Sequence, residues 1–154
     1  MSESKEDALR KKNMATLDKF FNFHVAGTTR EERIKLFADE AVMQTGFAEP
    51  PEQTVGIEAI RKRFHMLAKY FKDYKYYNVK INSTQDPNKF FVEEGGFGII
   101  LKPGAPPLTP KAPNPHINLM IMEDGKIKLW REYFDQLYAM KLLGVEVPEF
   151  LPLG

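Results

Sequence analysis

The sequence predicts an α+β fold in which a curved antiparallel sheet wraps around helices near the N-terminus. Two stretches, 7–25 and 57–71, carry apolar residues at the steps of three and four that one face of a helix requires. Runs rich in aromatic and β-branched residues fill most of 74–134, as strands require. Among them, Asp124-Gly125 separates two apolar runs and is a strong hairpin signal.

Size and charge limit the possible functions. The chain has 154 residues, 43% of them apolar, which suits one hydrophobic core rather than two domains. We therefore expect a single domain over 1–154, with 1–6 flexible and 144–154 forming a tail that packs on the body or on a partner subunit. A formal net charge of +1 provides no field to attract nucleic acid or a membrane surface, so we expect neither as a partner.

Several kinds of site are disfavoured by what the sequence lacks. Cysteine is absent, which excludes disulfides and thiolate ligands, and His24, His65 and His116 show no metal-ligand spacing. The glycines of 95–98 are not followed by a helix, as a phosphate-binding loop would be. We expect no metal and no cofactor. No apolar run approaches membrane-spanning length and no signal peptide is evident, so the expected location is the cytoplasm.

The N-terminal half predicts helices and one short strand. The first helix extends from about Asp7 to Val25 and is ended by Gly27. Thr28 and Glu31 have the spacing of a capping box, which begins a short second helix. We then expect a strand over 41–45, a loop over 46–53 and a strongly amphipathic helix over 57–71.

The C-terminal half predicts hairpin-connected strands. These lie over 74–81, 90–101, 116–122 and 127–135, before a short helix over 136–143. The glycines within 90–101 suggest a bulge or bend there. The connection 102–115 holds six of the eleven prolines, so it is a stiff loop. It is either a plain connection or a lid, gate or dimer-contact arm.

Glu132 is the ionisable residue that is hardest to place on a surface. Strict alternation along 127–135 puts Lys128, Trp130, Glu132 and Phe134 on one face, so Glu132 lies between two aromatic residues. One interpretation is a surface strand with Glu132 in a salt bridge. The other is a carboxylate inside a cavity, where desolvation makes it a usable acid or base.

Three stretches resemble the phenazine-biosynthesis A/B proteins. They are FKDYKYYNVKI at 71–81, DPNKFFVEEGGFGII at 86–100 with Lys102-Pro103-Gly104 after it, and DGKIKLWRE at 124–132. Val147-Pro148 extends the likeness, which covers most of the chain from about residue 30. The resemblance implies an NTF2-like (cystatin-like) cone, the fold shared with ketosteroid isomerase, scytalone dehydratase and SnoaL-like polyketide cyclases.

The family resemblance also implies a function. It implies a homodimer whose cone binds a small cyclic amino-ketone carboxylic acid, with a glutamate and a histidine as acid/base groups in a condensation. The family's glutamate falls on Glu132, and its carboxylate-binding arginine on Arg33 or the nearby Arg30. The position of the catalytic histidine carries Arg63. His65, two residues along, lies about 200° further round a helix.

The remaining candidates come from the same comparison and from the aromatic pattern. Two further family histidines are replaced by Phe97 and Asn118, while His116 has no counterpart. An Arg63 close to Glu132 would hold that carboxyl group ionised. Alongside Glu132 as the catalytic residue, we expect these residues to contact a ligand: Arg33, Arg63, His116, Trp130, Phe97 and Tyr76. The aromatic members also suit a sheet core.

Three functions remain open. The first is an acid/base enzyme of the cyclase, isomerase or condensing type that uses Glu132. The second is a small-molecule-binding protein that lost catalysis with its histidine. The third is a dimerisation module whose cone is filled by its own side chains, which an open cavity of a few hundred cubic ångström would argue against.

Overall fold

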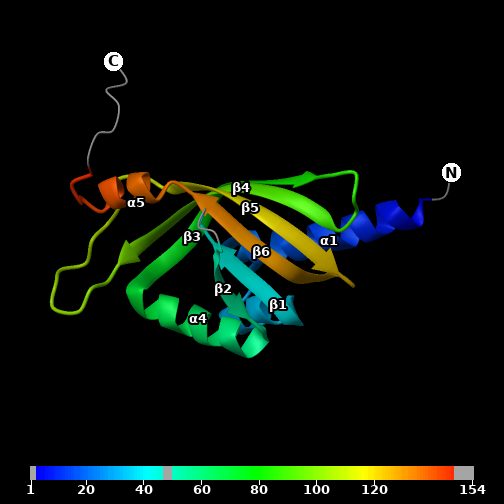
Figure 1. Ribbon diagram of the computed structural model, residues 1–154, viewed down its shortest axis with the longest axis horizontal. Coiled ribbons are helices and arrows are strands. Elements are labelled where there is room, and N and C mark those ends of the chain that lie inside the picture. Colours follow the sequence, from blue (N-terminus) through cyan, green and yellow to red (C-terminus); the bar gives the residue numbers. More distant parts are fainter. Residues whose placement is uncertain (1–2, 47–49, 148–154) are drawn as a thin grey trace, which may run out of the picture.

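The computed structural model describes residues 3–46 and 50–147, which form one sheet with helices against it (Figure 1). The elements in chain order are α1 Lys5–Phe21, α2 Phe23–Ala26, α3 Arg30–Ile34, β1 Phe37–Thr45, β2 Glu52–Val55, α4 Ile57–Tyr70, β3 Phe71–Ser83, β4 Lys89–Ile100, β5 Asn114–Glu123, β6 Lys126–Phe134 and α5 Gln136–Leu142. The expected tail was 144–154, and its residues 148–154 lie outside the described residues.

The sheet has six strands in the order β2-β1-β6-β5-β4-β3. Neighbouring strands are antiparallel except β1 and β6, which are parallel. Helices α1 and α4 contribute core residues to the same side of the sheet (Figure 1). The predicted α+β class and curved sheet are confirmed, and the parallel pair is the feature that the sequence pattern did not indicate.

Two helix boundaries differ from the prediction. The helix expected to reach Val25 is divided at Asn22, and Gly27 then ends α2 with a positive φ of 68°. The capping box lies one residue later than expected. Thr29 accepts from the backbone N–H of Glu32, whose side chain accepts in return from the N–H of Thr29. Thr29 has the extended backbone that an N-cap needs, which decides between the two threonines.

Strand β2 begins at Glu52, within the loop expected over 46–53, and continues to Val55. It pairs with β1 through Val42 opposite Val55, and its four residues are mostly exposed. A strand this short and polar shows no alternation of apolar and polar residues in the sequence. It is a strand because its backbone hydrogen-bonds to β1. The turn at Asp124-Gly125 is confirmed, with φ of 51° and 79°.

A bulge in β6 changes which side chains share a face. Ile121 pairs with Leu129 while Met122 pairs with Ile127, so β6 holds one extra residue there. Ile127 and Trp130 are therefore both buried, and Lys128 is exposed. The strict alternation that placed Lys128 beside Trp130 is wrong, whereas Trp130 and Glu132, beyond the bulge, do share a face.

The bends predicted from the glycines of β4 lie in its partner. Strand β3 carries the extra residues, and Asp73 and Asn78 adopt positive φ where the register shifts. The glycines instead make room for Tyr74. A Cβ at Gly96 would lie 2.0 Å from the Tyr74 hydroxyl oxygen, and one at Gly98 would lie 2.7 Å from its ring.

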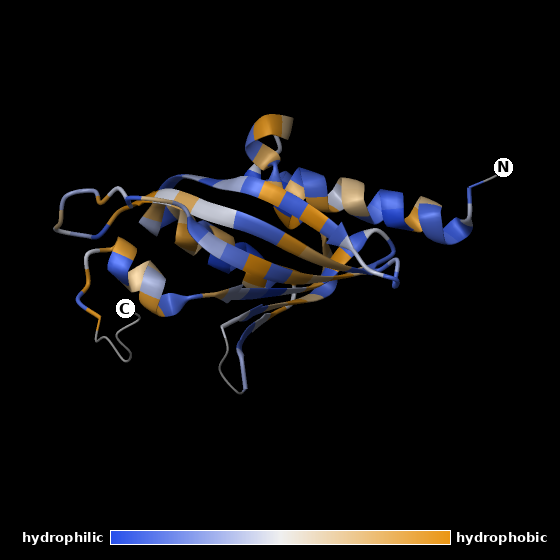
Figure 2. Cartoon of the chain, turned by 90° about the horizontal axis from the view of Figure 1, so that it is seen from above, coloured by the Kyte–Doolittle hydropathy of each residue, from blue (hydrophilic) through white to orange (hydrophobic). Residues whose placement is uncertain are grey.

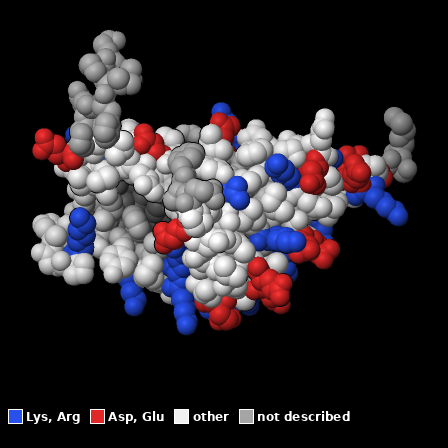
Figure 3. Space-filling view, in the orientation of Figure 1, with Lys and Arg blue, Asp and Glu red and all other residues white. Residues whose placement is uncertain are grey.

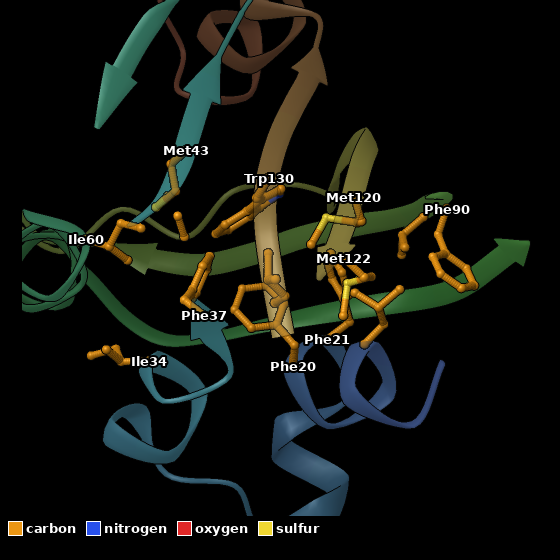
Figure 4. Close-up of a cluster of buried hydrophobic side chains, with 14 of the residues drawn as sticks. Phe20, Phe21, Ile34, Phe37, Met43, Ile60, Phe90, Met120, Met122 and Trp130 are labelled. Atoms are coloured by element: carbon orange, nitrogen blue, oxygen red, sulfur yellow. The ribbon is translucent and has the colours of Figure 1, made fainter. Parts of the chain in front are cut away.

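The core lies between α1, α4 and the concave face of the sheet (Figure 4). Phe20 of α1 makes an edge contact with Trp130 at 5.0 Å between ring centroids. Figure 2 shows hydrophilic and hydrophobic residues alternating along the strands, as expected where one face is buried. Of the helices described, none combines the length and apolar character needed to cross a membrane.

Candidate functional site

A cavity of about 590 Å³ lies on the concave side of the sheet. Its lining comes from helices α2 to α4, from all the strands except β2, and from α5 and the proline-rich loop through Pro110 and Ala112. Figure 3 shows the molecular surface hollowed at this end, with charges of both signs scattered over the visible face. An open cavity of this size argues against a cone filled by its own side chains.

Three ionisable side chains from three neighbouring strands lie close together, and two of them, His116 and Glu132, line the cavity. Glu94 of β4 is opposite His116 of β5, and Glu132 of β6 is opposite Asn118. The closest nitrogen or oxygen atoms of Glu94, His116 and Glu132 all lie within 4.8 Å of one another. Such a group of two carboxyls and an imidazole can share protons, and it could also hold a divalent cation.

A buried chain of hydrogen bonds holds the Glu94 side chain in place. The Trp130 indole N–H donates to Asn118 Oδ1 at 2.8 Å, and Asn118 Nδ2 donates to Glu94 Oε1 at 3.2 Å. The Glu94 side chain is 0% exposed, and its second oxygen, Oε2, has no hydrogen-bond partner. A buried oxygen without a partner is costly, so this orientation is set by the surrounding network.

Burial raises the pKa of Glu132, and Glu94 raises it further. His116 and Arg63 act in the opposite direction and do not outweigh these effects. Arg63 therefore acts in the expected direction, toward the ionised form of Glu132, but burial outweighs it and the pKa remains raised. Arg63 does line the cavity, but its guanidinium also approaches Thr54 Oγ1 at 3.5 Å and Glu52 Oε1 at 3.7 Å.

His116 is held against Glu94. Its Nδ1 lies 3.2 Å from Glu94 Oε1, within ion-pair distance although the hydrogen-bond alignment is poor. Burial alone would lower the pKa of His116, but the carboxyls of Glu94 and Glu132 outweigh it, and the pKa is raised. The imidazole therefore retains its proton to a higher pH than a free histidine does.

Arg33 places a cation in the aromatic wall of the cavity. Its Nε donates to the Phe20 carbonyl at 3.0 Å, and its guanidinium lies 4.1 Å from the Phe23 ring centroid. Burial lowers its pKa, and Tyr76, whose hydroxyl is 3.5 Å from Nη2, opposes that effect. Within 3–46 and 50–147, no carboxylate forms a salt bridge with Arg33.

The neighbouring candidates lie elsewhere. Arg30 is exposed at the rim of the cavity and approaches His65 Nδ1 at 3.4 Å. His65 pairs with Glu31 at 3.1 Å on the surface and does not line the cavity. Both arginines line the cavity, and Arg33 is the buried one.

The aromatic candidates divide between the two faces of the sheet. Tyr76 and Trp130 line the cavity and are 5% exposed, so they are both core and wall. Phe97 was expected to contact a ligand, and this expectation is wrong. Phe97 is opposite Lys75 in the sheet, whereas the next pair along the strands is Tyr76 opposite Gly96, whose residues face the cavity. Phe97 therefore points to the outer face, where its ring packs on Tyr77.

Sequence reasoning missed Glu94 and the role of Asn118. Glu94 is in phase with Gly96 and Gly98, which line the cavity, so period-two alternation was the signal available for Glu94. The link from Asn118 to Trp130 depends on the register between β5 and β6, which the sequence does not specify.

The family model for phenazine biosynthesis protein A/B matches residues 3–152. The chain belongs to the phenazine biosynthesis A/B family. It is 33% identical over 143 residues to phenazine biosynthesis protein PhzA2 of Pseudomonas aeruginosa, covering 92% of this chain and 86% of the relative. It is 34% identical to PhzB1 of the same species, again over 143 residues, with the same coverage.

Solved structures agree with this family placement. The crystal structure of a phenazine biosynthesis-related protein, PhzB2 of Pseudomonas aeruginosa, has a TM-score of 0.82 at 29% identity, covering 97% of this chain and 96% of that one. A putative SnoaL-like polyketide cyclase from Jannaschia has a TM-score of 0.68 at 18% identity, covering 96% and 99%. The second likeness shows the NTF2-like, SnoaL-like fold alone.

Proposed function

We propose that this phenazine biosynthesis A/B family member binds a small cyclic molecule bearing a carboxylate and a carbonyl group, and performs acid/base chemistry on it. One observation carries the proposal. The buried guanidinium of Arg33, which forms no salt bridge within 3–46 and 50–147, and the carboxyl group of Glu132, whose pKa is raised, line the same cavity of about 590 Å³.

Arg33 is suited to hold the ligand's carboxylate. A guanidinium offers paired N–H donors that match a carboxylate, and a buried one gains most from such a partner. Tyr76 and Phe23 stack around the cation and limit its movement. The carboxylate of the ligand would then supply the charge balance that Arg33 lacks.

Glu132 is suited to move a proton on the ring. A carboxyl group with a raised pKa is a stronger base when ionised, and once protonated it keeps its proton to a higher pH than an ordinary carboxyl group. The proposed step is removal of a proton from the carbon beside the ligand's carbonyl, followed by its return or by condensation at that carbon.

The test uses a cyclohexanone that carries a carboxylate on its ring, incubated with the protein in heavy water. Proton NMR would follow deuterium uptake at the carbons beside the ketone, and calorimetry would follow binding. We expect wild-type protein to catalyse uptake, Glu132→Gln to bind without uptake, and Arg33→Met to bind at least about tenfold more weakly. Arg30→Met is the matched control, because it removes an exposed arginine of the same helix.

Two results would contradict the proposal in different ways. Binding without uptake by wild-type protein would favour a non-catalytic binding protein, the alternative suggested by arginine at the family's histidine position. Equal loss of binding in Arg30→Met and Arg33→Met would remove Arg33 as the specific anchor.

A further inference from the structure

A histidine on the adjoining strand β5 and a second carboxyl group on β4, the next strand along, lie close to Glu132. His116 lines the cavity, and its Nδ1 is 3.2 Å from Glu94 Oε1. Their side chains are 7% and 0% exposed, so neither group is a solvated surface charge. An ionisable pair this deeply buried requires either mutual compensation or a function.

The pair is held in one arrangement from both sides. Asn118 donates to the same Glu94 oxygen that faces His116, and Trp130 fixes Asn118 in turn. On the other side, the backbone of Gly96 approaches the imidazole so closely that a Cβ there would lie 3.0 Å from His116 Cε1. The carboxyl group and the ring are therefore positioned before any ligand binds.

The orientation of the ring determines which nitrogen is available. With Nδ1 facing a carboxyl group, the proton on that side is retained, and the opposite nitrogen is left to exchange a proton with a ligand. Glu132 lies close enough for both groups to reach one small molecule, since the nearest atoms are within 4.8 Å.

We propose that His116, positioned by Glu94, is the proton-transfer partner of Glu132 and supplies from β5 the imidazole that this chain lacks at Arg63. The inference rests on the proposed function. As Glu132 takes the proton from the carbon beside the carbonyl, the C–H electron pair forms the C=C bond. The carbonyl π pair takes a proton from protonated His116, giving an enol. Return of both protons restores the ketone and the two side chains.

Other charged or titratable groups surround this pair. Arg63 of α4 lowers the pKa of Glu132. The carboxyl groups of Glu132 and Glu94 raise the pKa of Tyr74 and of Tyr76 on β3. The remaining charged residues that line the cavity are Arg30, Arg33 and Asp73. None of them lies on β4 or β5, so substitution of Glu94 changes the carboxyl group nearest to His116 and leaves the cations in place.

The first experiment is an NMR pH titration of the histidine rings, which needs no ligand. The chain has three histidines, so their signals can be assigned by substitution. We expect Glu94→Gln to lower the pKa of His116 by about one unit or more, because it removes an adjacent charge but keeps an acceptor for Asn118. Glu31→Gln is the control, because it removes a surface carboxyl group that pairs with His65, and it should leave the pKa of His116 unchanged. An unchanged His116 pKa in Glu94→Gln would overturn the proposed positioning.

The second experiment measures deuterium uptake by the cyclohexanone carboxylate across pH. We expect His116→Gln to slow uptake by about 100-fold. Glu94→Gln should move the pH dependence of kcat with the His116 pKa, and Glu94→Asp should partly restore it. One outcome separates the two proposals. If Glu132→Gln abolishes uptake, but His116→Gln and Glu94→Gln both keep the wild-type rate and pH profile of uptake, the inference fails and the proposed function stands. If wild-type protein shows no uptake, both fail.

A metal ion is the remaining explanation for the same side chains. Calorimetry with Zn²⁺ and with Mn²⁺ would test it directly, using wild-type protein and His116→Gln. Stoichiometric binding that is lost in His116→Gln would assign the cluster to a cation and overturn the proton-transfer role. If neither metal ion binds in this way and the pKa of His116 is lowered in Glu94→Gln, the proton-transfer role of His116 is supported.

Discussion

Replacing Glu132 with glutamine should stabilise the protein at neutral and alkaline pH and leave it unchanged in acid. Burial raises the pKa of Glu132 above the ordinary 4.5, so the folded state disfavours the ionised form. Well below pH 4.5 the Glu132 carboxyl group is protonated in both the folded and the unfolded state, so its burial has no pH-dependent effect on the free energy of unfolding. As the pH rises from there through the raised pKa, the unfolded state gains relative stability, and this cost then persists at higher pH. Glutamine does not ionise, so Glu132→Gln does not have this loss of folding stability.

Each unit by which the pKa is raised corresponds to about 1.4 kcal/mol. For a domain of this size, about 1 kcal/mol changes Tm by about 2–4 °C, so each unit by which the Glu132 pKa is raised predicts a gain of about 3–6 °C for Glu132→Gln. Thermal unfolding followed by circular dichroism between pH 4 and pH 8.5 would measure it. Glu123→Gln is the control, because Glu123 is on the same hairpin and forms only an exposed pair with Lys128. A Tm for Glu132→Gln equal to or below that of wild type at pH 8 would refute the reasoning.

Three further outcomes are expected. Gly96→Ala should lose about 1–3 kcal/mol in urea unfolding through its clash with the Tyr74 hydroxyl, and addition of Tyr74→Phe should restore part of it; no recovery would contradict the packing argument. Asn118→Leu should lose about 2–4 kcal/mol, because it leaves the Trp130 N–H without its acceptor; the tryptophan emission should report this unfolding. We also propose a homodimer formed through the outer sheet face, where Ile117 is 51% exposed. Light scattering should then show a dimer for wild type and a monomer for Ile117→Lys, and a monomeric wild type would exclude it.

The elements with strong local signals were predicted well. Helix α4 has an uninterrupted apolar stripe after Gly56, and the Asp124-Gly125 turn has the chemistry that positive φ demands. Both are decided by residues near in sequence. The division of the first helix at Asn22 and the pairing of β2 with β1 depend on contacts with distant segments. Local pattern does not contain that information.

The candidate site shows the same division. Glu132 was found because a carboxyl group between Trp130 and Phe134 is unusual on a sheet face, and the structure does place it at the cavity. Phe97 was misplaced because the bulges of β3 and the phase of β4 decide which aromatic side chains face inward. Glu94 went unnoticed because its importance comes from its register with His116, on a separate strand.

The family resemblance and the geometry therefore lead to different expectations about proton transfer. The resemblance implies a histidine where this chain has Arg63, so it leads to the expectation that proton transfer was lost. A cavity, however, receives side chains from every element around it, and a base needs a partner at the right point in space rather than at the right position in the sequence. His116 reaches Glu132 from the neighbouring strand, and the buried Glu94 and Asn118 behind it are what a loosely placed surface histidine would not need.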